Sequence, residues 1–144
     1  MFRILIAEDN PGDVLLFREA LRGCNLSFEI VVAEDGQRAM ALLEDLGKAG
    51  PQRGTDLIVL DVNLPKHCGD EILENIRRDP SWAEIPVIML TASASPDDQA
   101  RAKQLGANLY IQKSANLDDL FEIGRAVEAL LKHKGGSRPD VSSA

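Results

Sequence analysis

Leu57-Ile58-Val59-Leu60-Asp61-Val62-Asn63-Leu64-Pro65 is the most informative segment of this sequence. Its first four residues are all apolar, too few for a helix and rich in branched side chains, which is typical of a strand buried on both faces. The run ends abruptly at Asp61, and Asn63 and Pro65 then end the strand. We therefore expect Asp61 where the strand leaves the core, at the carboxyl edge where parallel sheets bind ligands.

Length and composition narrow the class of protein. The 144 residues fit one domain, and a chain of this size buries roughly two-thirds of its unfolded surface. Acidic residues number 23 against 16 basic ones, a net charge of −7, so direct binding to nucleic acid is disfavoured. Short apolar runs and an early strand pattern predict no membrane span and no signal peptide, hence a cytoplasmic protein. Cys24 and Cys68 lack metal or redox spacing and are expected to be free thiols.

Short apolar runs alternate with helical patterns along the whole chain. The predicted strands cover residues 3–7, 28–32, 57–60, 85–90 and 109–112. The predicted helices cover residues 11–22, 36–46, a stretch around 72–76, 96–105, and 117–131 after a cap at Asn116. This alternation predicts an α/β fold, a doubly wound parallel sheet of five strands covered by helices on both sides. Periodicity does not determine the strand order.

If the order is the flavodoxin-like 2-1-3-4-5, four strands that lie side by side end in polar residues at one edge. These residues are Glu8 and Asp9, Asp61, Thr91, and Lys113. Converging carboxylates repel one another and persist by binding a proton or a cation, and a cation is the better hypothesis. A few hard oxygen ligands with room for water and a phosphate favour Mg²⁺. We expect Asp9 and Asp61 as direct ligands, Glu8 through water, and the backbone carbonyl of Asn63 as a further ligand.

The same edge contains the groups that phosphoryl transfer requires. Asp61 would attack as an aspartyl nucleophile, with Mg²⁺ neutralising the developing charge. The Lys113 ammonium would pair first with Asp61 and then with the phosphoryl oxygens, and Thr91 would donate a hydrogen bond to the product.

Glu8-Asp9, Asp61, Thr91 and Lys113 resemble the pattern of receiver domains in two-component response regulators, in both residue type and order. The resemblance covers residues 2 to about 133, and it implies phosphorylation of Asp61 by a histidine kinase or phosphotransfer protein. It also implies a switch in which Thr91 moves toward the phosphoryl group and Tyr110 turns inward. Such a protein is a phosphoacceptor switch that catalyses its own phosphotransfer and dephosphorylation, not a turnover enzyme.

Three segments resemble the single-domain regulators that partner phytochrome-type kinases: the loop from Gly47 to Gly54, the run from Asn63 to Lys66, and Lys113-Ser114. We expect a receiver domain at residues 1–134 and a disordered tail at 135–144, too short for an output domain. The signal would then pass by contact, through the lightly packed helix at 96–105 with the neighbouring last strand and helix. That face could carry a homodimer or a downstream protein whose identity the sequence does not reveal, with no nucleic acid and no membrane involved.

One position departs from the family pattern. Receiver domains usually follow the lysine with a proline, often in a cis bond that aims the ammonium, whereas this chain has Ser114. A cis bond before serine costs roughly 3 kcal/mol, so either the site holds that strain or Lys113 is aimed by another route.

Other interpretations of the same residues remain open at this point. Taken singly, Asp61 is more simply a turn residue, Thr91 an ST-turn, Lys113 a surface lysine, and Tyr110 plain packing. A dehalogenase-type hydrolase would need a second acid where Asn63 stands, and a flavodoxin-like cofactor binder would need a phosphate loop in place of Glu8-Asp9. A pseudo-receiver used only for docking would leave the intact acid set unexplained. His67 and His133 have no ligand partners at suitable spacing and are interpreted as surface residues.

Overall fold

The computed structural model describes residues 2–24, 26–47, 55–62, 64, 69–80, 82–92, 95–113 and 116–136. The strands are β1 (Phe2–Ala7), β2 (Phe28–Ala33), β3 (Leu57–Asp61), β4 (Val87–Thr91) and β5 (Leu109–Gln112). The helices are α1 (Pro11–Arg22), α2 (Gly36–Gly47), α3 (Gly69–Arg78), α4 (Pro96–Leu105) and α5 (Leu117–Gly136). All strand pairs are parallel and the order is β2-β1-β3-β4-β5, which confirms the predicted α/β fold and the flavodoxin-like order.

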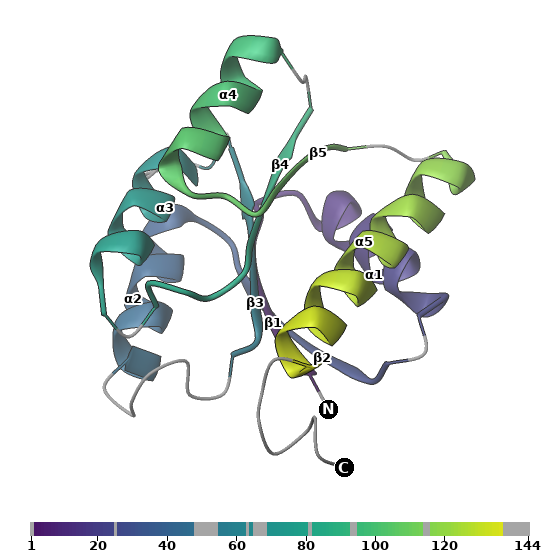
Figure 1. Ribbon diagram of the computed structural model, residues 1–144, viewed down its shortest axis with the longest axis horizontal. Helices are drawn as coiled ribbons and strands as arrows, with labels where there is room; N and C mark the ends of the chain where they lie inside the picture. The colour runs from purple at the N-terminus through teal and green to yellow at the C-terminus, as the bar shows by residue number, and fades with distance from the viewer. Residues whose placement is uncertain are drawn as a thin grey trace.

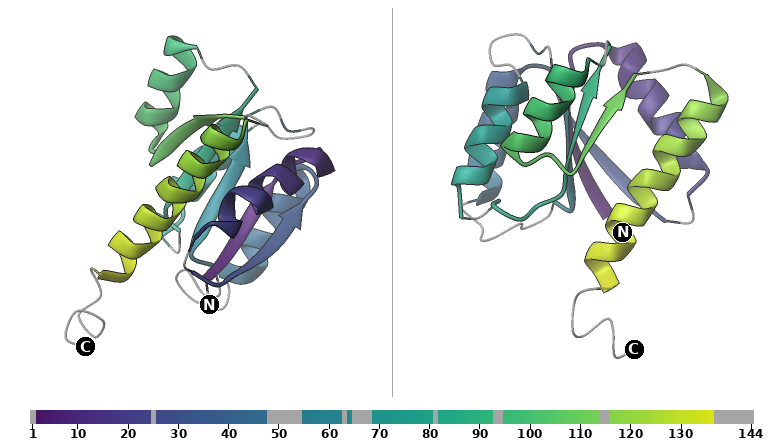
Figure 2. Two further views of the ribbon diagram at one scale, coloured as in Figure 1. Left: turned by 90° about the vertical axis from the view of Figure 1, so that its right-hand side faces the viewer. Right: turned by 45° about the horizontal axis from the view of Figure 1, so that its top comes forward.

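Helices cover both faces of this sheet, with α2, α3 and α4 on one side and α1 and α5 on the other (Figures 1 and 2). Alternate residues of the central strands therefore enter different cores. Leu5, Ile58, Leu60 and Met89 pack with the side chains of α2 and α3. Ile6, Leu57, Val59 and Ile88 pack with those of α1 and α5. All five residues of β3 are buried, as its uninterrupted apolar sequence predicted.

The fourth strand begins two residues later than predicted, at Val87 instead of Ile85. The backbone N–H of Ile85 donates to the Trp82 carbonyl, so Ile85 still belongs to the turn after α3. Both Ile85 and the strand residues that follow are fully buried. Because turn and strand share one apolar run, hydrophobicity could not mark the boundary between them.

Helix α4 is lightly packed, as its polar sequence predicted: of its ten residues, Ala102 is the buried one. It ends at Gly106, whose φ of 103° lies in the left-handed region that favours glycine. Helix α5 runs to Gly136, two residues past the predicted domain boundary at 134, and the remaining tail lies outside the described residues. In the part of the chain that the structure describes, no helix combines the length and apolarity needed to span a membrane.

Helices α1 and α5 approach each other closely at Gly124. A Cβ atom at this position would overlap the backbone carbonyl oxygen of Ala20 on α1. The Cys24 thiol donates a hydrogen bond of 3.1 Å to the Gly124 carbonyl at the same crossing, and Cys24 is a free thiol as predicted. Cys68 lies outside the described residues. The absence of a side chain at Gly124 thus sets how closely α5 can pack against α1.

We predict that Gly124→Ala lowers the free energy of unfolding by about 2 kcal/mol or more, because the added methyl group must push backbone atoms apart. Gly23→Ala is the matched control, because its added methyl group would meet nothing within 4 Å and its φ is −78°. Urea unfolding followed by circular dichroism measures both variants. Equal stability of the two would show that the crossing tolerates a wider helix separation.

Candidate functional site

Strand register brings most of the predicted polar residues to one edge of the sheet. Asp61 is the last residue of β3 and Thr91 the last of β4, and the adjacent positions pair as Asp61 with Leu90 and Thr91 with Gln112. The backbone N–H of Lys113 donates 2.7 Å to the Thr91 carbonyl, which places the lysine directly after β5 beside β4. Glu8 follows β1, next to β3. Thus β1, β3, β4 and β5 each deliver a functional side chain to this edge.

The ammonium of Lys113 lies at the centre of the site. Its Nζ atom is 2.8 Å from Glu8 Oε1, 2.8 Å from Asp13 Oδ2 and 3.0 Å from Asp61 Oδ2. The contacts with Asp13 and Asp61 are hydrogen bonds. Glu8 Oε1 is buried and accepts no hydrogen bond from the described residues, so its contact with the lysine is an ion pair. Three of the predicted residues are therefore near one another, as expected.

Asp13 is the site residue that the sequence analysis missed. It lies in the first turn of α1, where an acidic residue is ordinarily explained by the helix dipole. Asn10 caps this helix by accepting from the backbone N–H groups of Gly12 and Asp13. Because α1 begins at Pro11, three residues after Glu8, its first turn lies over the sheet edge. That short connection was the available signal for a further acid at the site.

Burial and neighbouring charges shift the pKa values of Glu8 and Lys113. Burial is the largest of the effects that raise the pKa of Glu8 to about 7; the neighbouring Asp61 carboxylate raises it as well, and Lys113 acts in the opposite direction. For Lys113, burial lowers the pKa, but Asp13, Glu8 and Asp61 outweigh this effect and the pKa is raised overall. The lysine therefore stays charged at neutral pH, while Glu8 lies close to its titration midpoint.

The carboxylates of Glu8, Asp9 and Asp61 form a group that could hold a metal ion. Each offers an oxygen, and these atoms all lie within 4.8 Å of one another. Glu8 and Asp61 are buried, whereas Asp9 is exposed. Asn63, the fourth predicted ligand, lies outside the described residues. The donors are all hard oxygens with an open side, which suits Mg²⁺ or a similar cation.

The backbone behind Asp61 is closely packed. A Cβ atom on Gly69, the first residue of α3, would lie 2.6 Å from the Asp61 carbonyl oxygen and 3.0 Å from Met89 Cε. The backbone N–H of Gly69 also donates 3.1 Å to the Val62 carbonyl. The start of α3 thus supports the end of β3 from behind, which holds Asp61 in a fixed place relative to its neighbours.

The two predicted switch residues lie on neighbouring strands. Thr91 is 3% exposed at the end of β4. Tyr110, on β5, is half-buried against the core on the α2–α3 side, and its hydroxyl group is buried without a hydrogen-bond partner in the described structure. Ser114, and with it the Lys113–Ser114 bond, lies outside the described residues. His67 lies outside them too, as does the side chain of His133.

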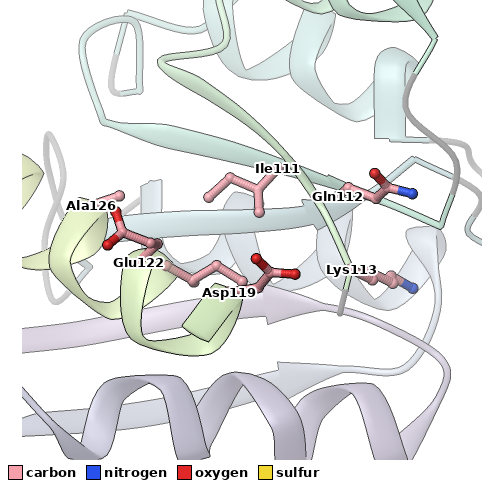
Figure 3. A pocket seen from close by; sticks show the side chains of 7 residues that line it. Ile111, Gln112, Lys113, Asp119, Glu122 and Ala126 are labelled. Carbon is pink, nitrogen blue, oxygen red and sulfur yellow. The ribbon is translucent and has the colours of Figure 1, made fainter. Parts of the chain in front are cut away.

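A groove of about 570 Å³ runs from Lys113 along the surface between β5 and α5. Figure 3 shows Asp119 and Glu122 of α5 on one wall and Ile111 and Gln112 of β5 on the other. Ile123 and Ala126 of α5 add apolar side chains to the lining. The groove therefore connects the charged edge with an acidic, partly apolar surface on β5 and α5.

Comparison with known proteins agrees with this geometry. The model of the response regulator receiver domain matches residues 4–125. Response regulator Rcp1 of Synechocystis sp. is 38% identical over 126 residues, 88% of this chain and 86% of Rcp1.

Two solved structures are similar over nearly the whole fold. The Mn²⁺-bound form of Rcp1 superimposes with a TM-score of 0.75 and 37% identity, over 90% of this chain and 93% of that one. The phosphorylated cyanobacterial phytochrome response regulator RcpA gives a TM-score of 0.77 and 40% identity, over 92% and 95%. Family match, sequence identity and structural similarity agree: this chain belongs to the response regulator receiver domains.

Proposed function

We propose that Asp61 is the residue on which this receiver domain accepts a phosphoryl group. The family consists of phosphoacceptor switches of two-component signalling. The observation that carries the assignment is the position of Asp61: a buried carboxylate at the end of β3, hydrogen-bonded to Lys113 and grouped with Glu8 and Asp9. An Asp61 oxygen forms the new bond to phosphorus while the donor's bond breaks, a P–N bond in phosphohistidine or a P–O bond in acetyl phosphate. The donor leaves with the electron pair.

The acid group fits Mg²⁺, with Asp9 and Asp61 as direct ligands, Glu8 through water, and the Asn63 carbonyl as a further ligand. Support comes from the all-oxygen donor set and from Glu8 Oε1, a buried oxygen that pairs with Lys113 but accepts no hydrogen bond from the described residues. The solved Mn²⁺-bound form of Rcp1 shows that a similar chain takes a divalent cation. When bound, the metal ion supplies positive charge to the phosphoryl oxygens.

Lys113 and Thr91 act on the phosphoryl group from the protein side. Lys113 is charged and already hydrogen-bonded to Asp61, so it can follow the negative charge from the carboxylate to the transferred group. Thr91 ends the strand beside Asp61 and can donate a hydrogen bond from its hydroxyl group to the phosphoryl oxygens of the product. The same two residues and the metal ligands would carry the later self-catalysed dephosphorylation.

A histidine kinase is the proposed phosphoryl donor, because receiver domains interact with such kinases. A phytochrome-type kinase is the specific proposal. RcpA is a cyanobacterial phytochrome response regulator, and its match with this chain extends over 95% of RcpA. Residues 1–134 would then form the receiver domain that takes the phosphoryl group from this kinase.

Tyr110 and Thr91 form the proposed conformational switch. A buried hydroxyl without a partner costs about 1–3 kcal/mol, so the Tyr110 ring has a reason to adopt a second position in which its hydroxyl is solvated. Movement of Thr91 toward a phosphoryl group would change the space beside Tyr110, because β4 and β5 are adjacent. The equilibrium between ring positions could then report the state of Asp61.

The output surface in this proposal is formed by α4, β5 and α5. Helix α4 is lightly packed, and the groove beside β5 presents Asp119 and Glu122 over an apolar lining. A second copy of this chain or a downstream protein with complementary basic and apolar residues would fit such a surface. Either partner would contact a surface that changes when α4 or Tyr110 moves.

We predict that acetyl phosphate and Mg²⁺ add one phosphoryl group to the wild-type protein and none to Asp61→Asn, because the amide is a poor nucleophile. Intact-mass spectrometry measures the product. Asp97→Asn, an exposed first-turn position of α4, is the matched control and should be labelled like the wild type. Equal labelling of Asp61→Asn would remove Asp61 from this role and would favour a docking module whose acids have another purpose.

We predict that Lys113→Ala binds Mg²⁺ about tenfold more tightly while its labelling by acetyl phosphate slows. Lys113 pairs with Glu8 and Asp61, two members of the metal group, and so competes with the ion for them. Isothermal titration calorimetry measures the affinity, with Lys103→Ala on α4 as the control that removes an exposed ammonium. Weaker Mg²⁺ binding in Lys113→Ala would contradict the competition.

We predict that the metal-free protein loses stability relative to Glu8→Gln as the pH rises from about 4.5 to 7. The pKa of Glu8 is raised in the folded state from 4.5 to about 7, so the folded protein holds this proton more tightly. The resulting stabilisation is complete below pH 4.5 and is lost through pH 7, at about 1.4 kcal/mol for each pKa unit. Urea unfolding with EDTA measures it; a difference between the two proteins that does not change with pH would refute the shift.

A further inference from the structure

Asp13 supplies Lys113 with a partner that comes from outside the sheet. Its Oδ2 accepts a 2.8 Å hydrogen bond from the lysine Nζ, from a side chain 25% exposed against 16% for the lysine. The two residues are 100 positions apart in the sequence. Charged hydrogen bonds between partly buried groups are among the stronger ones in proteins. The contact therefore holds the free end of a long side chain to the first turn of α1.

Asp13 is positioned to serve the lysine and not the metal. Among the described residues, the carboxylates that converge closely enough for a cation are those of Glu8, Asp9 and Asp61, and Asp13 is outside this group. A divalent ion held by that group would become the main electrostatic partner of Glu8 and Asp61. Asp13 is then the carboxylate that remains for Lys113, because its own position does not depend on the metal ligands.

The lysine needs such a partner because its backbone fixes only one end. The hydrogen bond from its backbone N–H to Thr91 places the Cα atom, while the four-carbon stem has about 2 kcal/mol of rotamer entropy to lose. An ammonium already held by Asp13 has lost that freedom before the phosphoryl group arrives. Asp13 can thus position the ammonium without the proline that usually follows the lysine in this family, where this chain has Ser114.

We propose that Asp13 is a positioning residue, which holds the Lys113 ammonium beside Asp61 so that it meets the phosphoryl group. The inference rests on the proposed phosphorylation of Asp61. Asp13 touches neither the phosphoryl group nor the metal in this arrangement; it acts through the lysine. Its N-terminal place in α1 gives it a second, purely structural effect on the helix dipole, and the experiment has to separate the two.

The test measures the affinity for beryllofluoride, a mimic of the phosphoryl group, and the rate of labelling by acetyl phosphate, both at saturating Mg²⁺. Asp13→Asn should lower both about tenfold, the loss typical of one charge-assisted hydrogen bond. Asp13→Glu should recover part of the loss, since it restores the charge. Asp118→Asn, which removes a first-turn acid from α5 in the same way, should leave both values near the wild type.

A double-mutant cycle shows whether Asp13 acts through the lysine. In the Lys113→Ala background, Asp13→Asn should cause no further loss of beryllofluoride affinity. An equal loss in both backgrounds, or a loss no larger than that of Asp118→Asn, would reduce Asp13 to a helix-end residue and overturn the proposal. Faster labelling of Asp13→Asn would also overturn it, since Asp13 would then hold the lysine away.

The outcome is separable from that of the proposed function. Wild-type labelling that is lost in Asp61→Asn but unchanged in Asp13→Asn would refute only the role of Asp13. Labelling that persists in Asp61→Asn would refute the phosphoacceptor assignment itself, and the positioning role would fail with it.

Discussion

The structure depends on one electrostatic constraint: Glu8, Asp9, Asp13 and Asp61 meet at one edge of a sheet with Lys113 among them. Four carboxylates and one ammonium leave an excess of negative charge in a partly buried place. The excess can be reduced by protonating Glu8, whose pKa is raised to about 7, or by binding a cation. Metal binding and proton binding are thus alternatives at the same oxygens, and the lysine shares the charge in both cases.

The hydrophobic core makes this constraint tolerable. The fully buried β3, with apolar side chains in both cores, fixes the backbone just before Asp61. Gly69 closes the space behind the Asp61 carbonyl, where even a methyl group would be too close. Because burial of the strands contributes far more free energy than one strained carboxylate costs, the fold can keep repelling acids near one another. Binding a cation can then relieve the repulsion between these acids.

Periodicity predicted the strands and helices, and the flavodoxin-like strand order, which periodicity does not determine, brings the strand ends to one edge. Apolar runs that end at Asp61, Thr91 and Lys113 mark strand ends, and parallel strands bring their ends to one edge. Asp13 has no such marker. Its position within α1 is ordinary for a helix start, and its contact with Lys113 depends on how the helix crosses the sheet. The start of β4 could not be predicted from the sequence either, because Ile85 lies in a turn but is as buried as the residues of the strand.

The same reasoning explains why a signal would leave the site through β5 and α4. The residues that hold Asp61 are on buried strands or packed against them. They therefore have little freedom to move when the charge on Asp61 changes. Helix α4 has Ala102 as its buried residue, and β5 is the edge strand that carries both Tyr110 and the residue before Lys113. A phosphoryl group on Asp61 would draw the lysine and Thr91 toward it, and the elements attached to them with the least buried surface would shift most easily. In the proposed switch, the rigid centre and the loosely packed margin would therefore be two requirements: the first would fix where the charge changes, and the second would determine which surface responds.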